Sequence, residues 1–360
     1  MLLVSCKVNG EEKSFDDILI AGAASYAIRD GDTEIAMYSL PDFTVSPSLP
    51  DIPARVENMT SLNYVTLSFI GDCMLASYRG EDWWNTFNSF ANEVEPEYFF
   101  AEVADIFKND DFTIANCENV FTDDNSLYES RKSGNPVYWY KSPKKNAEIF
   151  TAGGVDIISV ANNHTYDYGE QGYLDTIAAA EAAGLLWGDN NNIAYAQKDG
   201  FRIAFLFVTI TERGNIDSLR PMIDEAEEKA DYTIVYFHGG TEHVYRPSAN
   251  IVRMAHDMVD AGCDLVIGSH PHVLQPIEYY NGATIVYSLG NFIFGAGRGE
   301  NRTIIYQYTI YFSDTQVLKT EENVIPCYCF VERWQPAVIE DYDIRKRVLD
   351  FMQSLLPTPL

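Results

Sequence analysis

The chain has 360 residues, 46% of them hydrophobic and 22% charged, which is typical of a folded protein with one large domain or two smaller ones. Its formal net charge of -28 at pH 7 repels polyanions, and no stretch rich in Lys and Arg offers a phosphate-binding patch. Composition and charge thus argue against a disordered chain and against nucleic acid as a partner.

Residues 1–60 differ from the rest of the chain. They contain short strand-like runs at Ile18–Ile20 and Glu34–Tyr38, and the stretch Leu40–Pro53 holds four prolines. Proline lacks the N–H that a strand ladder needs, so this stretch predicts a linker or an extended crossing segment. We expect a small β-rich N-terminal segment followed by that linker.

Targeting and membrane segments are not visible in the sequence. The apolar start, Met1–Cys6, is too short for a signal peptide, and no run of about twenty apolar residues could span a membrane. The six cysteines form no Cys-x-x-Cys pair, so we expect buried free thiols. A cytoplasmic location is the default interpretation of these features.

From Tyr64 onward, short apolar runs alternate with amphipathic segments. Helices are expected between the strands, for example over Gly172–Ala183 and Ala249–Ala261, and strands that alternate with helices predict an α/β sheet covered by helices. We place the main domain at 61–312 and expect 313–360 to form a C-terminal extension packed on it. The expected strands are Val65–Ile70, Phe112–Ala115, Asp156–Val160, Arg202–Val208, Tyr232–Phe237, Leu265–Ile267 and Thr284–Tyr287.

Polar side chains gather directly after most of these strands. The carboxyl ends of strands are where loops converge and ligands bind in an open α/β sheet. Five of the six histidines lie in these clusters, and only His256 does not. Carboxylate, amide oxygen and imidazole together suit a divalent ion such as Zn, Mn or Fe. The clusters are Gly71-Asp72, Asn116–Asn119, Asn162–His164, His238–His243, Gly268–His272 and Ser288–Asn291.

Six strings within Tyr64–Phe294 resemble, in order and spacing, the motif series of the CapA family of poly-γ-glutamate capsule-synthesis proteins: GDCM, ANCEN, NNHTYDYG, HGGTEH, GSHPHVLQ and YSLGNF. That family resembles a branch of the metallophosphatase superfamily. The resemblance implies a metallophosphatase-like β-sandwich flanked by helices (αββα). It also implies a site for two metal ions that attacks a phosphoester with a metal-activated water.

The resemblance assigns a role to individual residues of this chain. It implies that His164 is the general acid or stabilises charge in the transition state. It implies metal ligands at Asp72, Glu118 (in the bridging position), Asn163, His238, His270 and His272.

Some positions depart from the expected pattern. Met74 stands where the superfamily has an imidazole, and Glu118 stands where it has the shorter aspartate. Gly239 stands where an aromatic residue is usual in the CapA pattern, and His243 where tyrosine is usual. A single tightly held ion and a pair of ions both remain open.

Simpler interpretations stand beside these assignments. Asp72 would then form a turn, Glu118 would pair locally, and His270 and His272 would be solvated loop residues. We expect Asp167 to shape a loop rather than to take part in chemistry.

Four further residues are candidate substrate contacts. Glu242 and His243 either contact the substrate or orient a metal-bound histidine. Arg246 either grips a carboxylate or phosphate or balances nearby surface acids. Asn291 is assigned to the substrate side of the site.

The sequence leaves three functions open. The first is a metallo-hydrolase of capsule or exopolymer synthesis or release, which activates water on a phosphoester or acyl group. The second is a small-molecule phosphoesterase, and the third is a polymer-binding component with a structural metal. The expected partner is an anionic polymer or a phosphorylated small molecule, and the resemblance implies association with the cell surface. The net charge of -28 does not suit a polyanionic partner unless the metal and Arg246 create a positive groove.

Overall fold

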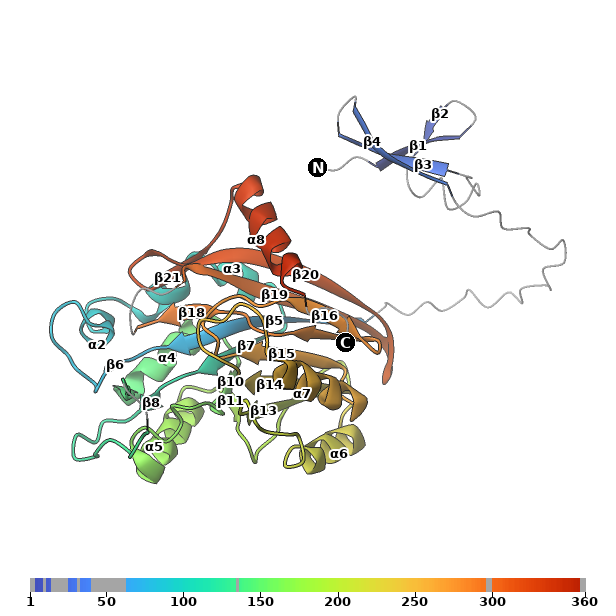
Figure 1. The fold of residues 1–360 in the computed structure, drawn as a ribbon. Coiled ribbons are helices and arrows are strands. Elements are labelled where there is room, and N and C mark those ends of the chain that lie inside the picture. Colours follow the sequence, from blue (N-terminus) through green and yellow to red (C-terminus); the bar gives the residue numbers. More distant parts are fainter. Residues whose placement is uncertain are drawn as a thin grey trace. The chain divides into compact units, whose positions relative to one another are not determined.

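The structure is a computed structural model that describes residues 4–8, 11–13, 25–30, 33–39, 63–133, 136–295 and 300–356. The chain divides into two units, Met1–Thr60 and Ser61–Leu360, which we describe separately (Figure 1). The predicted run Ile18–Ile20 and the proline-rich stretch Leu40–Pro53 lie outside the described residues.

The first unit contains an antiparallel sheet with the strand order β2-β1-β3-β4. The predicted run Glu34–Tyr38 lies within its edge strand β4. The strands are β1 (Val4–Val8), β2 (Glu11–Lys13), β3 (Ser25–Asp30) and β4 (Thr33–Ser39).

The second unit is built around two sheets. The larger sheet has the order β11-β10-β7-β5-β19-β20-β21, with β18 added beside β5, and the smaller has the order β12-β13-β14-β15-β17-β16. The strands of the larger sheet are β5 (Asn63–Met74), β7 (Phe112–Cys117), β10 (Ile157–Ser159), β11 (Leu186–Gly188), β18 (Asn291–Phe294), β19 (Arg302–Ser313), β20 (Gln316–Glu332) and β21 (Gln335–Val338). Those of the smaller sheet are β12 (Ala194–Lys198), β13 (Phe201–Thr209), β14 (Tyr232–His238), β15 (Leu265–Ser269), β16 (Ile277–Tyr280) and β17 (Ala283–Val286).

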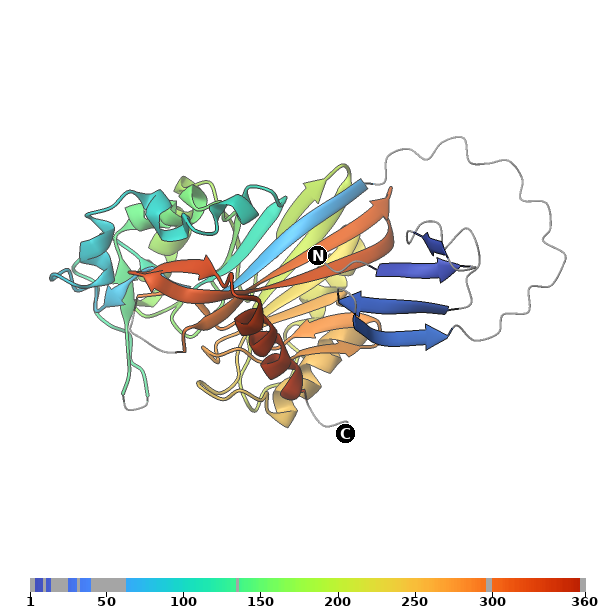
Figure 2. The ribbon, with the colours of Figure 1, turned by 90° about the horizontal axis from the view of Figure 1, so that it is seen from above.

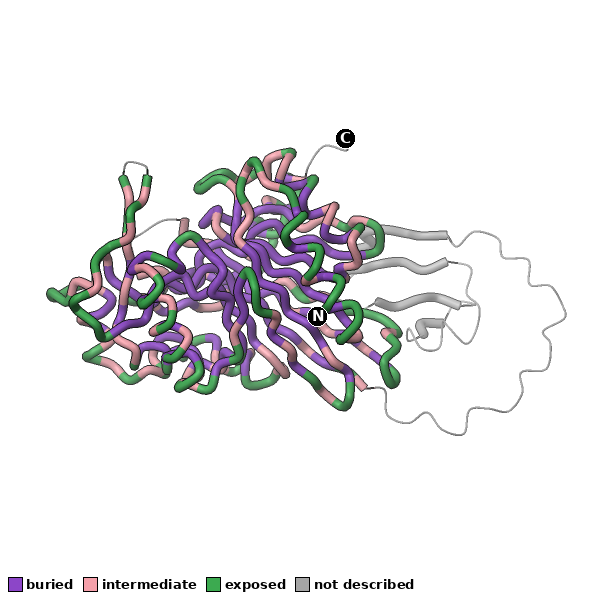
Figure 3. Tube along the Cα trace, turned by 90° about the horizontal axis from the view of Figure 1, so that it is seen from below, coloured by how far each residue is buried: buried purple, intermediate pink, exposed green. Residues whose placement is uncertain are grey.

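The two sheets pack face to face. Alternate residues of β5, such as Leu67 and Phe69, share one buried cluster with Phe205 and Phe207 of β13. The residues between them point to the outer face, because successive side chains of a strand face opposite sides of the sheet. Leu206 of β13, for example, belongs to a different cluster. Figure 3 shows the buried residues concentrated in the central strands of this unit.

Helices cover the outer faces of both sheets (Figures 1 and 2). Over the larger sheet lie α2 (Phe87–Ala91), α3 (Ala104–Phe107), α4 (Glu148–Ala152), α5 (Gly169–Ala182) and the 3-10 helices η1 (Pro96–Phe100) and η2 (Lys144–Ala147). Over the smaller sheet lie α6 (Arg220–Lys229) and α7 (Ala249–Asp260), while α8 (Tyr342–Ser354) packs on β20. Within the described part of the chain, no helix has the length and apolarity needed to cross a membrane.

The α/β fold with a β-sandwich flanked by helices is therefore confirmed. Each of the seven predicted strands overlaps an observed strand, and the two predicted helices correspond to α5 and α7. The expected end of the main domain, residue 312, lies inside β19. The chain beyond it continues the larger sheet, because β20 pairs with β19 and β21 pairs with β20. A small third sheet, β6 (Ser77–Tyr78), β9 (Tyr140–Ser142) and β8 (Val120–Phe121), lies beside the larger one.

Aspartates fix the amino ends of four parallel strands. Each aspartate precedes its strand by one residue, and its carboxylate accepts the N–H of one residue in the neighbouring strand at 2.8 Å. Its own N–H donates to the carbonyl of that same residue, at 2.7 to 3.0 Å. We call each such pair of hydrogen bonds an aspartate clamp. The clamps set the register of the strands, so that the carboxyl ends of the strands meet at one edge. The pairs are Asp111 with Thr66, Asp156 with Thr113, Asp231 with Arg202 and Asp264 with Thr233.

One clamp makes stability depend on pH. Burial raises the pKa of Asp264 to about 6, above the value of about 3.9 in an unfolded chain. The folded state therefore holds this proton more tightly, and its contribution to stability is present below about pH 4 and lost as the pH rises through about 6. We predict that Asp264→Asn raises the midpoint of thermal unfolding relative to wild type above pH 6, with a difference that shrinks toward pH 4.

The check is a series of melting curves from pH 4 to pH 8. Asp264→Ala is the matched control, because it removes the acceptor as well as the charge and should be less stable than Asp264→Asn at every pH, by about 1 kcal/mol in unfolding free energy. A constant offset between Asp264→Asn and wild type over this range would contradict the prediction.

Candidate metal centre

The candidate site lies where the carboxyl ends of strands from both sheets meet. Asp72 stands near the end of β5, Glu118 directly follows β7, and His238 is the last residue of β14. His270 follows β15. The His238 Nδ1 atom lies 3.6 Å from Asp72 Oδ1, so the two sheets touch through these side chains.

The backbone around Asp72 is irregular and closely packed. The register of β5 against β7 shifts between Phe69 and Asp72, and a bulge of this kind redirects a side chain. A Cβ atom on Gly71 would lie 1.9 Å from the carbonyl oxygen of Gly290, which accepts the Asp72 N–H at 3.0 Å. Only glycine fits there, and Gly290 itself has a φ of 74°.

Asp72 is a buried carboxylate that the site holds in its charged form. Its Oδ1 accepts from Asn116 Nδ2 at 2.8 Å, and its Oδ2 accepts from the His270 N–H at 3.1 Å. Burial alone would raise its pKa, but hydrogen bonds from His238 and His272 and their charges hold the pKa well below the ordinary value.

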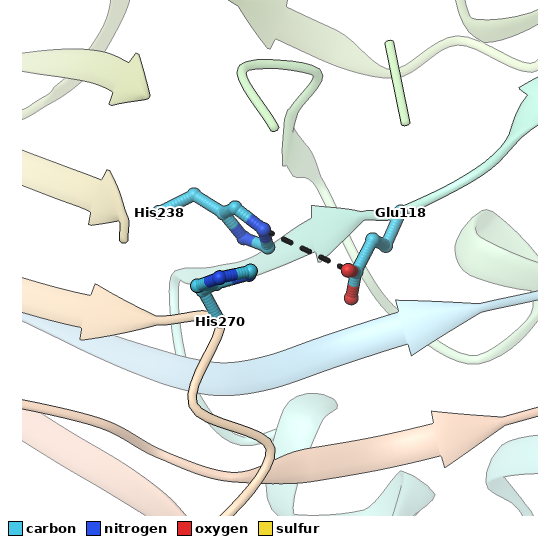
Figure 4. A group of neighbouring side chains, drawn as sticks. All are labelled: Glu118, His238 and His270. Carbon is cyan, nitrogen blue, oxygen red and sulfur yellow. Dashed lines mark ion pairs between the residues drawn. The ribbon is translucent and has the colours of Figure 1, made fainter. Parts of the chain in front are cut away.

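Glu118 is buried and its carboxylate oxygens have no hydrogen-bond partner among the described residues. Three imidazole Nε2 atoms surround its Oε1, at 3.6 Å for His238, 3.8 Å for His272 and 4.0 Å for His164. Burial and the negative charge of Asp72 raise the pKa of Glu118 well above its usual value. Figure 4 shows the Glu118 carboxylate facing the rings of His238 and His270.

These distances suit a shared cation. Two atoms that bind the same ion at about 2.1 Å each lie roughly 3.0 to 4.2 Å apart, depending on the angle between them. His270 Nδ1 is a further buried atom without a hydrogen-bond partner in the described part of the chain. Three groups place their ligand atoms within 4.8 Å of one another, and Glu118 belongs to two of them: Glu118 with His238 and His270, Asp72 with Glu118 and His272, and Glu242 with His270 and His272. The residues present therefore fit a divalent ion.

Neighbouring amides and carboxylates orient His272. Its Nδ1 lies 2.8 Å from Asn291 Oδ1 and 3.2 Å from Asp72 Oδ2, which leaves Nε2 on the side of Glu118. Burial lowers the pKa of His272, but the Glu118 charge and the Asp72 hydrogen bond outweigh it and raise the pKa to about 10. Asn291 thus acts on the site through His272.

His238 is held in the same way, with both ring nitrogens engaged. Its Nδ1 lies 3.1 Å from Asn116 Nδ2 and 3.2 Å from Ser269 Oγ. Its Nε2 lies 2.8 Å from Oδ1 of Asn163, whose residue is otherwise exposed. Asn116 and Ser269 are partners to which the sequence alone assigned no role in the site.

Two histidines of the Gly268–His272 segment have an unusual backbone. His270 has a φ of 95° and His272 a φ of 58°, in the left-handed region that non-glycine residues rarely adopt. Such strain persists only where the surroundings hold it, and it gathers at functional sites. His272 is buried, so the turn directs its ring inward rather than into solvent.

His164 and Asp167 form a buried pair beside Glu118. The His164 Nδ1 atom lies 2.8 Å from Asp167 Oδ2, and Nε2 is turned toward Glu118. Asp167 also accepts the Tyr140 N–H at 2.7 Å and pairs with Lys132. From sequence, Asp167 was expected only to shape a loop, and this contact was missed, although its spacing of three residues from His164 is compatible with it.

The remaining predicted residues lie at different distances from this cluster. Glu242 is exposed at its open side, grouped with His270 and His272. The ring of His243 lies 6.1 Å from that of His272, centroid to centroid. The Arg246 guanidinium donates instead to the carbonyls of three residues at the end of α8, Ser354, Leu355 and Leu356, at 2.9 to 3.2 Å.

Met74 and the cysteines near the site are buried and apolar in their surroundings. Met74 packs with Ala76 and Tyr140. Cys73 and Cys117 are free thiols, and burial raises the pKa of Cys117 to about 12. Neither thiol suits a nucleophile.

Comparison with known proteins places this site in a family. Residues 66–296 match the model of the bacterial capsule synthesis protein family PGA_cap. The chain is 30% identical over 267 residues to the PGA biosynthesis protein CapA of Bacillus subtilis (strain 168), covering 68% of this chain and 67% of that protein. It is also 30% identical over 289 residues to the capsule biosynthesis protein CapA of Bacillus anthracis, covering 73% and 67%.

Similar solved structures are more distant. A novel phosphatase of Mycoplasma pneumoniae is 14% identical, with a TM-score of 0.45 and coverage of 74% of this chain and 94% of that chain. A hypothetical protein of Thermus thermophilus is 17% identical, with a TM-score of 0.44 and coverage of 73% and 99%.

The unpartnered carboxylate of Glu118 generates a prediction about stability. In metal-free protein its buried charge near Asp72 is unfavourable, so Glu118→Gln should raise the unfolding midpoint by a few degrees. The same variant should lose most of the rise that Mn or Zn produces in wild type, because a bound ion stabilises only the state that holds it. Melting curves in EDTA and in excess metal measure both effects.

Glu170→Gln, at the exposed start of α5, serves as the control and should leave the rise that metal produces unchanged. The metal-site interpretation fails if metal stabilises Glu118→Gln as much as it stabilises wild type.

Proposed function

The chain belongs to the bacterial capsule synthesis protein family PGA_cap, and from this premise we propose that it is a metal-dependent hydrolase acting on a glutamyl capsule polymer. The names of its relatives refer to PGA biosynthesis and capsule biosynthesis, which motivates the substrate class. The proposed reaction is the cleavage of an amide bond of that polymer by water.

The observation that carries the proposal is the His164–Asp167 pair. A histidine with Nδ1 held by a buried carboxylate and Nε2 turned toward a metal-competent cluster has the arrangement of a general acid. An ion that only stabilises the fold has no need of an acid at its edge. This pair therefore supports catalysis over a purely structural metal.

The residues that would hold the ion are those brought together at the two sheet edges. A divalent ion at such a site polarises a carbonyl and lowers the pKa of a water, and Mn, Zn or Fe suits these donors. We assign its ligands to Asp72, Glu118, His238, His270 and His272, with Asn163 at the exposed side.

His164 would donate the proton that the leaving amine nitrogen needs. Asp167, which is nearer to Nδ1 at 2.8 Å than Lys132 Nζ is at 3.1 Å, would hold the Nδ1 proton, so that Nε2 is the atom that gives and receives the catalytic proton. Burial lowers the pKa of His164, which makes its protonated form the stronger acid, while Asp167 opposes this shift. Glu242 and His243, at the open side, are proposed to contact the substrate.

Charge favours an amide over a phosphoester when a single ion is bound. The buried carboxylates of Asp72 and Glu118 offset the charge of one divalent ion, which leaves little positive charge for a phosphate dianion. A phosphoesterase is the second candidate, because Glu118 belongs to two of the ligand groups and could be shared by two ions.

We predict that the full chain loaded with Mn or Zn shortens poly-γ-glutamate, and that His164→Asn slows this by about 10²- to 10⁴-fold. The variant should keep the metal content of wild type, since His164 is not among the proposed ligands. Size-exclusion chromatography and the appearance of new amine ends measure cleavage, and plasma mass spectrometry measures metal per chain.

Asp167→Asn is the matched second variant and should also keep its metal while losing activity. p-Nitrophenyl phosphate, tested in parallel, distinguishes the phosphoesterase. If metal-loaded wild type cleaves neither poly-γ-glutamate nor p-nitrophenyl phosphate, the hydrolase proposal is wrong and a polymer-binding role is favoured.

A further inference from the structure

The small third sheet brings a set of aromatic residues to the edge of the metal centre. β6 pairs with β9 so that Tyr78 stands opposite Tyr140, and the Arg79 N–H donates to the Trp139 carbonyl at 2.7 Å. The chain between β8 and β9 forms an arm over residues 122–139, of which 134 and 135 lie outside the described part.

Three tyrosines form a strip that starts at His164. The ring of Tyr140 lies 4.9 Å from that of His164, and Tyr138 stacks on Tyr140 at 6.2 Å with an interplanar angle of 15°. Tyr78 meets Tyr138 edge-on at 5.8 Å and Tyr140 edge-on at 6.4 Å, so all three rings contact one another. We call Tyr140, Tyr138 and Tyr78 the aromatic strip. The exposed fraction is 6% at Tyr140 and 47% at Tyr138, while Tyr78 is half-buried, so the strip reaches the surface at Tyr138.

Two cations flank the strip. Lys132 Nζ donates to the Tyr138 carbonyl at 2.8 Å, pairs with Asp167 and lies 3.1 Å from His164 Nδ1. The Arg79 guanidinium lies 5.1 Å from the centre of the Tyr78 ring. Its ion pair with Glu129 is long, at 3.7 Å, and both side chains are exposed, so a competing carboxylate could replace Glu129 at little cost.

The same aspartate that orients His164 also holds the arm. Its backbone carbonyl accepts the Ser130 N–H at 2.7 Å, and its carboxylate accepts the Tyr140 N–H. The Trp139 indole in turn donates to the Ser130 carbonyl at 2.9 Å. The strip is therefore fixed relative to the catalytic histidine before any ligand arrives, which lowers the entropic cost of binding.

We propose that the aromatic strip, with Arg79 and Lys132, binds an extended anionic polyamide chain and guides it to His164, an inference that rests on the proposed hydrolase function. The methylene groups of glutamyl residues would lie on the ring faces, and their carboxylates would meet the cations. The centroid steps from His164 to Tyr138 cover at most roughly 11 Å, which is room for about two γ-linked residues, because each has two more backbone atoms than an α-linked residue.

The combination of rings and cations favours this ligand over two others. A phosphorylated small molecule bound at the metal centre would not reach Tyr138 or Arg79. A neutral polysaccharide would stack on the rings but would leave Arg79 without a role.

The test is equilibrium binding to the full chain, with γ-linked glutamate oligomers of about ten residues, the dipeptide, and neutral dextran as probes. We expect Tyr138→Ala to weaken binding of the long oligomer about 10-fold and Arg79→Ala to weaken it by a similar factor, with little change for the dipeptide. Tyr138→Phe should bind as wild type does, because the ring is retained. Tyr342→Ala is the control, since Tyr342 is 67% exposed on α8, which Figures 1 and 2 place away from β6 and β8.

Binding measured in EDTA separates this inference from the proposed function. Binding of the long oligomer that depends on Tyr138, without cleavage after metal is restored, would support the strip and count against the hydrolase. If Tyr138→Ala and wild type cleave long and short chains equally fast, the proposed role of the aromatic strip is wrong, while the proposed hydrolase function stands. Dextran binding that displaces the oligomer would also overturn the choice of ligand.

Discussion

Two carboxylates that lie buried within a few ångströms of each other are the main physical constraint on the candidate site. Asp72 and Glu118 are both inaccessible to solvent, and like charges in a low-dielectric interior are costly unless other groups compensate them. Asp72 receives that compensation from within the chain, through Asn116, the His270 N–H and His272. Among the described residues Glu118 receives only imidazole edges at 3.6 to 4.0 Å, an arrangement that fits a divalent ion.

Much of the surrounding fold serves to hold that arrangement. The aspartate clamps at the amino ends of the parallel strands set the register, and the register decides which residues meet at the opposite edge. The close approach of Gly71 to Gly290 places Asn291 beside His272, and the left-handed turn at His270 points its N–H at Asp72. Each of these features has a cost in packing or backbone strain, and each acts on a side chain of the same site.

The sequence predicted the parts of this arrangement that follow from periodicity and topology. Val65–Ile70 and Tyr232–Phe237 are almost wholly buried and rich in apolar and aromatic residues, interrupted only by Thr66, Ser68 and Thr233, and the polar residues after them had to meet at one edge. Gln316–Glu332 escaped prediction because this long strand is largely polar and exposed over its first half. The contact of Arg246 with the end of α8 joins residues more than 100 positions apart, and no local pattern encodes it. The contact of Asp167 with His164 was not predicted, because a turn residue and a carboxylate beside a histidine look alike in sequence.

The burial of the site also bears on the net charge of -28, which first argued against a polyanionic ligand. At physiological ionic strength, charges on the surface are screened beyond about 8 Å, whereas charges inside a protein are screened much less. The distant surface acids therefore act mainly on the rate at which a polyanion approaches. The groups that a bound chain would meet are local: Lys132 is paired with Asp167, and Arg79 is only weakly held by Glu129. An acidic protein can thus bind an acidic polymer, provided that the contact is short, that aromatic surface contributes, and that a cation at the buried carboxylates removes the nearest negative charge.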